Sequence, residues 1–269
     1  MTTHTDEILS IRNLTVDFGG VRAVNNVSLS LKKGEMVALI GPNGAGKTTI
    51  FNLITNAVRP TTGQILLNGK NILGKSPDQI CRLGISRTFQ NIRLFPQMTA
   101  YENVELGLHS TPRYSLVEAF FRTPRARRIE SDTRKKALEL LEMVNLQDHA
   151  HARAASLPYG LQRRLEIARA MATSPQLLLL DEPAAGMNED ECNELIELVY
   201  KIHTSMQYTI IVIEHHMAVV MELCRDSRIY VLNLGSLLTV GTPQEIQNTP
   251  DVIKAYLGER KNARDLSAS

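Results

Sequence analysis

The stretch GPNGAGKTT, from Gly41 to Thr49, has the residue types and spacing of a phosphate-binding loop. Glycine lacks a Cβ, so the backbone N–H groups of such a loop can close around the phosphates of a nucleotide. Lys47 brings an ammonium group to the same phosphates, and the hydroxyl of Thr48 can bind Mg²⁺. We therefore predict binding of a nucleoside triphosphate with Mg²⁺, rather than a glycine-rich connection without a ligand. The expected contacts are Gly41, Pro42, Asn43, Gly44, Ala45, Gly46, Lys47, Thr48 and Thr49.

Two adjacent carboxylates form a second candidate site. Leu177 to Leu180 predict a buried strand that delivers Asp181 and Glu182 to the sheet edge where the phosphate loop also lies. Hard cations prefer carboxylate oxygen, so we assign Asp181 to Mg²⁺. Glu182 is placed to orient or deprotonate a water molecule that attacks the γ-phosphate, a role that contributes about 10² to 10⁴ in rate. The alternative is that both acids only cap the following turn.

Short apolar segments alternate with helical patterns around these residues and predict an α/β core with a parallel sheet. Met36 to Ile40 is expected to be a buried strand, and residues 48–57 the helix that follows it. Asn56 suits the left-handed conformation that often ends a helix. The remaining expected core elements are strands at 176–183 and 208–216 and a helix over 188–203.

Antiparallel strands are expected outside this core, where apolar and polar residues alternate. Two such runs lie within residues 8–31, separated by Gly19 and Gly20, and a hairpin is predicted around Asn68 and Gly69. A further hairpin is expected over 227–241. A helix should follow with Thr242 as its N-cap, Pro243 at its first position and Glu245 completing a capping box. A second helix is expected to begin at Thr249 and Pro250 and to stop at Gly258.

The middle of the chain, after about residue 90, has helical periodicity. In the segment 131–146, Ala137, Leu141 and Val144 share one face. The whole chain has 269 residues, 43% of them apolar, which allows one large domain or two small ones. No run approaches the roughly 20 apolar residues of a membrane-spanning helix, and the three cysteines have no ligand spacing. We expect a soluble, cytoplasmic protein.

Six motifs occur in one order along the chain: GPNGAGKTT, RTFQ, LPYGLQRRLEIARA, LLLLDEP, AAGMN and IEHH. In this order they resemble the motifs of ABC-type ATPases, over residues 7–258. The resemblance implies an α/β fold in which a P-loop NTPase core with a mostly parallel sheet carries an antiparallel β subdomain and an α-helical subdomain. The implied divisions are 7–90 for the antiparallel strands and P-loop core, 91–172 for the helical subdomain, 173–240 for the rest of the core, 241–258 for the C-terminal helices and 259–269 for a polar tail.

Several longer segments, RTFQNIRLFPQMTAYENV and VIEHHMAVVM among them, are similar to the ATP-binding subunits of bacterial branched-chain amino-acid importers. This similarity implies an ATP-hydrolysing subunit on the cytoplasmic face of the inner membrane. It would dimerise with ATP beneath a separate permease, which a periplasmic binding protein supplies with cargo. The alternatives are a transporter ATPase for urea or a lipid, a non-transport ABC protein acting on ribosomes or DNA, and a P-loop kinase. A single cassette without sustained heptads disfavours the non-transport ABC protein. A P-loop kinase would predict neither the LPYG loop nor a switch histidine.

The same resemblance assigns three further residues. Gln90 corresponds to the glutamine that touches Mg²⁺ and joins the core to the helical subdomain, where the permease would press. His215 corresponds to the switch histidine that contacts the γ-phosphate and holds the attacking water. Phe18 occupies the place of the aromatic ring that stacks on adenine, although a packing role at a strand end is the alternative. His216 receives no role.

The signature loop departs from the family pattern LSGGQ, because the chain has LPYGL at 157–161. In the family this loop begins a helix, here expected over Gln162 to Ala172, and contacts ATP held by the opposite subunit. Pro158, Tyr159 and Gly160 are the expected contacts, but Pro158 offers neither a hydroxyl nor an N–H. We hypothesise that a second, different ATPase subunit is the partner and that the two ATP sites work unequally. The alternative is that the backbone suffices. Asn188 stands where many relatives have Asp.

A basic cluster precedes and begins the segment 131–146. A solvated face is the first interpretation, and weak attraction to anionic lipid headgroups is the second. Nucleic-acid binding is not expected, because the formal net charge is only +2 and no aromatic residues are interleaved. The cluster comprises Arg122, Arg125, Arg127, Arg128, Arg134, Lys135 and Lys136.

Overall fold

The computed structural model describes residues 6–108 and 123–256 of the chain. Its centre is a six-stranded sheet in the order β10-β9-β3-β8-β7-β6, in which all neighbours pair in parallel except β10 and β9. The mostly parallel sheet predicted from the sequence is confirmed. Its strands are β3 (Met36–Ile40), β6 (Ile85–Arg87), β7 (Leu177–Asp181), β8 (Thr209–Ile213), β9 (Ile229–Asn233) and β10 (Ser236–Gly241).

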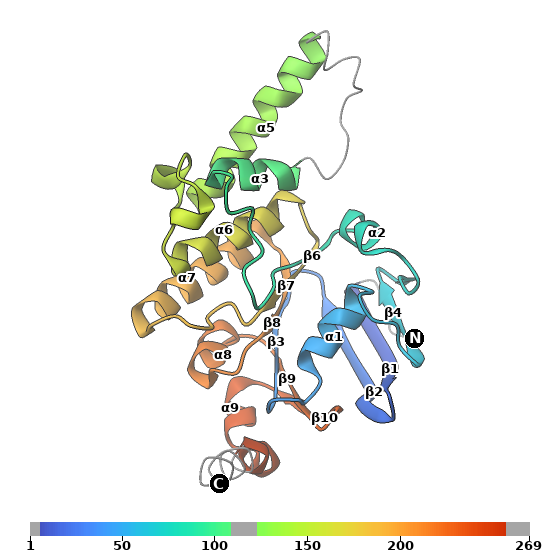
Figure 1. Cartoon of the computed structure of the whole chain (residues 1–269). Coiled ribbons are helices and arrows are strands. Elements are labelled where there is room, and N and C mark those ends of the chain that lie inside the picture. The colour runs from blue at the N-terminus through green and yellow to red at the C-terminus, as the bar shows by residue number, and fades with distance from the viewer. Residues whose placement is uncertain (1–5, 109–122, 257–269) are drawn as a thin grey trace.

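The central sheet is covered on both faces, as a parallel sheet requires. Alternate residues of β3 belong to two different cores: Met36 and Ala38 pack with the helices of one side, whereas Val37 and Leu39 pack with the other side. Figure 1 shows the helices of the first side, α6, α7 and α8, to the left of the sheet, and α1 to its right. Their bounds are α1 (Lys47–Ile54), α6 (Tyr159–Ala172), α7 (Glu189–Met206) and α8 (Met217–Leu223).

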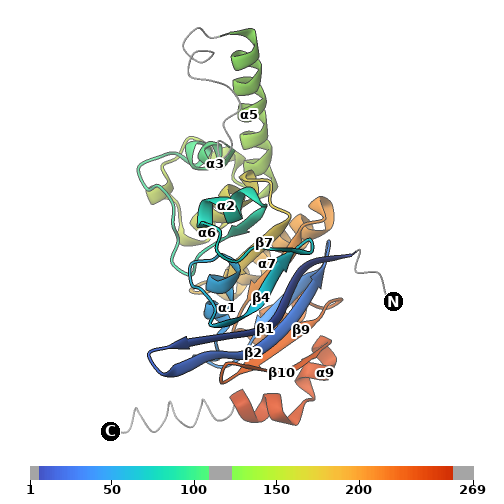
Figure 2. The same cartoon turned by 90° about the vertical axis from the view of Figure 1, so that its right-hand side faces the viewer.

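A second, four-stranded antiparallel sheet covers α1 on its far side (Figures 1 and 2), in the order β2-β1-β4-β5. The hairpin predicted at Asn68 and Gly69 is confirmed: Leu67 pairs with Lys70, and both turn residues have positive φ, 48° and 74°. The strands are β1 (Glu7–Phe18), β2 (Val21–Lys32), β4 (Thr62–Leu67) and β5 (Lys70–Asn71).

The helical block contains α3 (Ala100–Leu108) and α5 (Pro124–Met143), packed against α6, and α5 projects away from the sheets (Figure 2). The shared face of Ala137, Leu141 and Val144 is confirmed, since all three are buried. The helix that contains this segment begins earlier in the chain, because Thr123 caps it and Pro124 takes its first position. Arg122 lies outside the described residues.

Short helices flank the core. Helix α2 (Pro77–Arg82) lies between β5 and β6 in the chain, and α9 (Pro243–Gln247) follows β10. The capping box predicted at Thr242 and Glu245 is confirmed, and another helix begins at Pro250. The expected stop at Gly258 and the tail 259–269 lie outside the described residues, and the subdomain limits given above stay predictions.

Candidate nucleotide site

The phosphate loop joins the end of β3 to the start of α1, and backbone packing fixes its shape. Gly41, Gly44 and Gly46 all have positive φ. A Cβ on Gly41 would lie 2.2 Å from the carbonyl oxygen of Leu232, and one on Gly46 would lie 2.7 Å from that of Ala23. Glycine is therefore required at these two positions by the strands on either side of the loop as well as by an approaching phosphate.

Lys47 is buried at the first position of α1. Its Nζ donates to the carbonyl oxygens of Gly41 and Pro42, at 2.7 Å and 2.9 Å, so the ammonium lies across the mouth of the loop. No side chain caps the N-terminus of α1, and the positive end of the helix dipole lies at the loop, where it favours an anion. The helix ends at Ile54, earlier than expected, and the left-handed conformation predicted for Asn56 is confirmed by its φ of 53°.

Asp181 ends β7 and is 2% exposed. Its Oδ2 accepts a hydrogen bond from Arg87 Nη2 at 2.6 Å, and Arg87 also donates to Asn52 Oδ1 on α1 at 2.7 Å. Arg87 thus ties the strand that carries Asp181 to the helix that follows the phosphate loop. Sequence reasoning missed this residue, although it is the first letter of the RTFQ motif.

Glu182, Gln90 and His215 follow three neighbouring strands and converge. Gln90 Nε2 donates to Glu182 Oε2 at 2.9 Å, and His215 Nδ1 lies 3.7 Å from the same oxygen. Glu182 has a φ of 45°, a conformation that is rare for a residue with a side chain and costs about 1–3 kcal/mol. Its N–H donates to the carbonyl of Ile213 at 2.9 Å, which helps to hold this strained backbone in place.

The three predicted magnesium ligands line one cavity of about 500 Å³, together with Arg87 and Asn52. Thr48, Gln90 and Asp181 contribute a hydroxyl, an amide and a carboxylate oxygen to it. Such an all-oxygen set suits a hard divalent cation, so the side chains present fit Mg²⁺.

Glu214 is a buried carboxylate of the IEHH motif, and the sequence analysis assigned it no role. Its Oε1 accepts from the N–H of Ala184 at 2.8 Å, and its Oε2 from the N–H of His215 at 3.2 Å. Burial raises the pKa of Glu214 above its ordinary value, against the opposing effect of these two hydrogen bonds. The carboxylate links the loop after β7 to the loop that carries His215.

The signature residues lie apart from this cavity, at the start of α6. The helix begins at Tyr159 and not at the expected Gln162, because Pro158 takes the extended N-cap conformation. Tyr159 is 43% exposed, and a Cβ on Gly160 would lie 3.2 Å from Glu191 Oε1 on α7. Neither Pro158, Tyr159 nor Gly160 is among the residues that line the magnesium-ligand cavity.

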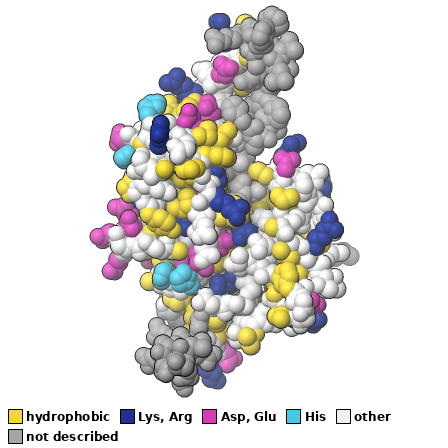
Figure 3. Space-filling model, viewed as in Figure 1, with side chains coloured by type: hydrophobic (Ala, Val, Ile, Leu, Met, Phe, Trp, Pro, Cys, Tyr) yellow, Lys and Arg dark blue, Asp and Glu magenta, His cyan; other side chains and the backbone are white. Residues whose placement is uncertain are grey.

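Asn188 begins α7 as its N-cap, and its Oδ1 accepts from the N–H of Glu191. An Asp at this position would make the same bond, so the departure leaves the helix start intact. Acidic side chains in the first turn of α7 complement the helix dipole, and Figure 3 shows acidic side chains gathered at the α7 edge of the face.

Phe18 ends β1 and is 46% exposed. The hairpin to which it belongs also includes Ala23, whose carbonyl faces Gly46 of the phosphate loop. An exposed ring on this hairpin is compatible with stacking on a base, and that role stays a prediction.

Comparisons with known proteins agree with this fold. Residues 24–185 match the family model described as ABC transporter, and residues 236–262 match the model described as branched-chain amino acid ATP-binding cassette transporter. The high-affinity branched-chain amino acid transport ATP-binding protein LivG of Salmonella typhimurium is 48% identical over 94% of this chain and 98% of that protein.

Two solved structures are similar in fold. The ADP conformation of MJ1267, an ATP-binding cassette of an ABC transporter, has a TM-score of 0.80 at 30% identity, covering 94% of this chain and 99% of that one. The dimeric post-hydrolysis state of the cassette MJ0796, bound to ADP and Pi, has a TM-score of 0.72 at 29% identity, covering 87% and 98%. The fold and the phosphate loop define an ATP-binding cassette. The chain belongs to the ABC transporter family, as an ATP-binding subunit whose hydrolysis of ATP is coupled to transport.

Proposed function

We propose that this subunit powers the import of branched-chain amino acids. The observation that carries the proposal is the 48% identity to LivG along nearly the whole length of both chains. The match of residues 236–262 to a branched-chain model supports the same cargo, because this segment lies beyond the general ABC match.

In the proposed reaction the phosphates of ATP lie in the loop 41–49, against Lys47 and the N-terminus of α1. Thr48, Gln90 and Asp181 would hold Mg²⁺, which supplies charge neutralisation at the β- and γ-phosphate oxygens. Glu182 accepts a proton from the attacking water while the bond between the γ-phosphorus and ADP breaks. The 2.9 Å hydrogen bond from Gln90 supports this role, since it orients the carboxylate.

His215 has a different role in the proposed reaction, which is to contact the γ-phosphate and hold the water. Its Nδ1 lies 3.7 Å from Glu182 Oε2, so one water molecule could contact both side chains. Glu214 supports the position of His215 by accepting the hydrogen bond of its backbone N–H.

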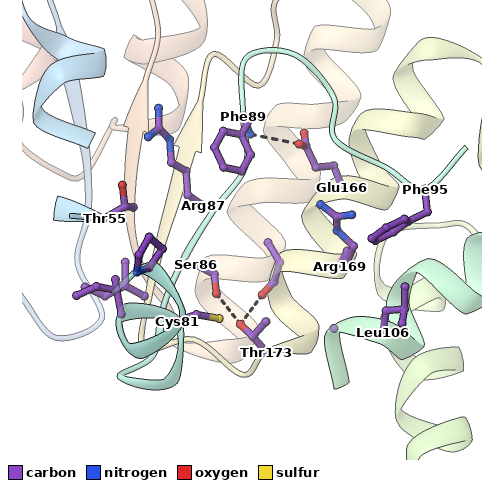
Figure 4. Close-up of a pocket in the computed structure, with 15 residues that line it drawn as sticks. Thr55, Cys81, Ser86, Arg87, Phe89, Phe95, Leu106, Glu166, Arg169 and Thr173 are labelled. Atoms are coloured by element: carbon purple, nitrogen blue, oxygen red, sulfur yellow. Dashed lines mark hydrogen bonds between the residues drawn. The ribbon is translucent and has the colours of Figure 1, made fainter. Parts of the chain in front are cut away.

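We further propose that the membrane permease presses on the groove shown in Figure 4, a cavity of about 580 Å³. One wall comes from α2 and β6, and the other from α3 and α6. Phe95 and Leu106 are 50% and 42% exposed there, and Arg169 lies over the Phe95 ring. A protruding element with an apolar face would cover these side chains. Gln90 follows Phe89 of the groove lining, so pressure in the groove can reach the nucleotide site.

A second ATPase subunit completes the proposed assembly, with Pro158, Tyr159 and Gly160 facing the ATP of that subunit. The dimeric state of MJ0796 supports such pairing. Because Pro158 has no N–H or hydroxyl for the anion, we propose that the partner is a different chain and that the two sites turn over unequally. Equal ATP turnover at both sites, measured with knockouts of one site at a time, would refute this.

The proposal places the subunit on the cytoplasmic face of the membrane, with a periplasmic binding protein supplying cargo to the permease. Within the described residues, no helix combines the length and apolar character needed to cross a bilayer. Binding to the separate permease would therefore hold this part of the chain at the membrane.

The test is purification of the subunit from membranes with its attached proteins, followed by reconstitution of the complex in vesicles. We expect ATP-dependent uptake of labelled leucine, and loss of this uptake when the subunit carries Glu182→Gln. Uptake of urea but not of leucine would contradict the proposed cargo.

A further inference from the structure

Arg163, in the first turns of α6, has no exposed surface, and each of its four Nη protons meets an acceptor. Nη1 donates to the carbonyl of Phe89 at 2.6 Å and to Glu166 Oε2 at 2.8 Å. Nη2 donates to the carbonyl of Gln90 at 2.7 Å and to the hydroxyl of Tyr159 at 3.1 Å. One guanidinium group therefore connects the start of α6 to the backbone of the segment that carries Gln90.

Glu166 also binds the backbone of the segment that carries Gln90. Its Oε1 accepts from the backbone N–H groups of Phe89 and Arg93, both at 3.2 Å, and Figure 4 shows the first of these bonds. Residues 89–93 are thus held through carbonyls by Arg163 and through N–H groups by Glu166. The spacing of Tyr159, Arg163 and Glu166 places all three on one face of α6.

The two ends of this connection lie at different functional surfaces. At one end, the Gln90 side chain donates to Glu182 Oε2. At the other end, Tyr159 is half-exposed at the signature loop, and a Cβ on Gly186 would lie 3.6 Å from its ring. A buried ion pair adds little stability compared with apolar side chains of similar volume. A planar guanidinium group with four fixed acceptors does, however, define the positions of the groups that it joins.

We propose that Arg163 is a positioning residue for ATP hydrolysis, which ties Tyr159 at the signature loop to Gln90 and so to Glu182. A shift of the signature end of α6 then moves the Gln90–Glu182 contact with it. This inference rests on the proposed catalytic role of Glu182.

The first test is Arg163→Lys, which keeps the charge but cannot reach all four acceptors. We expect kcat for ATP to fall by about tenfold to a hundredfold, while KM changes by less than about twofold, because the phosphate loop is untouched. Hydrogen exchange at the amides of Phe89 and Arg93 should become faster, and that of the phosphate loop should not. The matched control is Arg164→Lys, because Arg164 faces away and pairs with Glu194 of α7; it should leave both readouts unchanged.

The second test removes only the hydroxyl of the half-exposed Tyr159, which accepts from Arg163, and leaves the buried residues unchanged. Tyr159→Phe should lower kcat by a few-fold, and the double variant with Arg163→Lys should be no slower than Arg163→Lys alone. Additive losses would mean that Tyr159 acts separately from Arg163 and would overturn the proposal. If Arg163→Lys does not fold, Tyr159→Phe must speed exchange at residues 89–93, or the proposal is wrong.

Two further outcomes would overturn the proposal that Arg163 is a positioning residue. The first is a wild-type kcat in a folded Arg163→Lys variant. The second is that kcat and nucleotide affinity fall equally while hydrogen exchange becomes faster throughout the core. Failure of the proposed catalysis is separate. If Glu182→Gln hydrolyses ATP at the wild-type rate, the catalytic assignment is wrong, whereas the exchange at residues 89–93 still reports whether Arg163 holds them.

Discussion

The phosphate loop and the start of α6 both face nucleotide in the proposed assembly, but different forces hold them. The loop is fixed by contact between backbones, since a Cβ at Gly41 or Gly46 would collide with a carbonyl of a neighbouring strand. The start of α6 is held by side chains, through the hydrogen bonds of Arg163 to Tyr159 and to the Gln90 carbonyl. Any side chain added at these glycines would meet a backbone carbonyl, whereas the hydrogen bonds of Arg163 can be removed one at a time by substitution. In the proposed function the first region provides binding, and the second is suited to regulation.

The largest expected effect separates binding by the phosphate loop from chemistry at Glu182, which follows β7. Glu182→Gln should lower ATP hydrolysis by about 10² to 10⁴ and keep nucleotide affinity, because the amide retains the shape but cannot accept the proton. Steady-state ATPase assays and nucleotide titration measure the two quantities. The control is Lys47→Ala, which should weaken nucleotide binding through loss of the ammonium at the phosphates. Turnover at the wild-type rate in Glu182→Gln would contradict the assignment.

The sequence predicted the first region better than the second, for physical reasons. The glycine spacing and the leucines of β7 are local patterns. They predicted the loop, the strand and the placement of Asp181 and Glu182 at the end of that strand. Arg87, Arg163 and Glu214 were missed because their function depends on burial and on partners far away in the sequence. Arg163 contacts a segment about 70 positions earlier, and hydrophobic periodicity carries no information on such a pair. The late helix start predicted for α6 has a local cause, since Pro158 occupies the N-cap and the helix begins directly after it.

The next effect tests whether backbone contact fixes the loop. Gly41→Ala should lower the free energy of unfolding by about 3 kcal/mol, since the new Cβ would lie 2.2 Å from the Leu232 carbonyl. Gly44→Ala is the matched variant, because no atom lies within 4 Å of a Cβ there, although its φ is also positive. It should lose less stability than Gly41→Ala. Denaturant titrations compare the two, and equal losses would show that φ rather than contact dominates.

A pH effect of smaller size is expected from Glu214, which lies outside both regions and joins the loop after β7 to the loop of His215. Burial raises its pKa in the folded state above the unfolded value, so folding takes up a proton between these two values. The contribution of Glu214 to stability is therefore most favourable below the unfolded pKa and falls as pH rises through the folded pKa. Relative to Glu214→Gln, the wild type should become more stable as pH is lowered from 8 to 5. Unfolding curves at both pH values measure this, and an opposite trend would contradict it.

The smallest expected effect lies in the second region, where Pro158→Ser should improve the start of α6. Serine can accept a hydrogen bond from the helix as an N-cap, which Pro158 does not, and this adds about 1 kcal/mol to stability. The hydroxyl also gives the phosphate of the opposite subunit a donor, so turnover at that site should rise by a few-fold in the assembled transporter. Single-site knockouts separate this rise from activity at the other site. If stability rises but turnover does not, the backbone of α6 already satisfies the phosphate, and the two ATP sites differ for a reason other than Pro158.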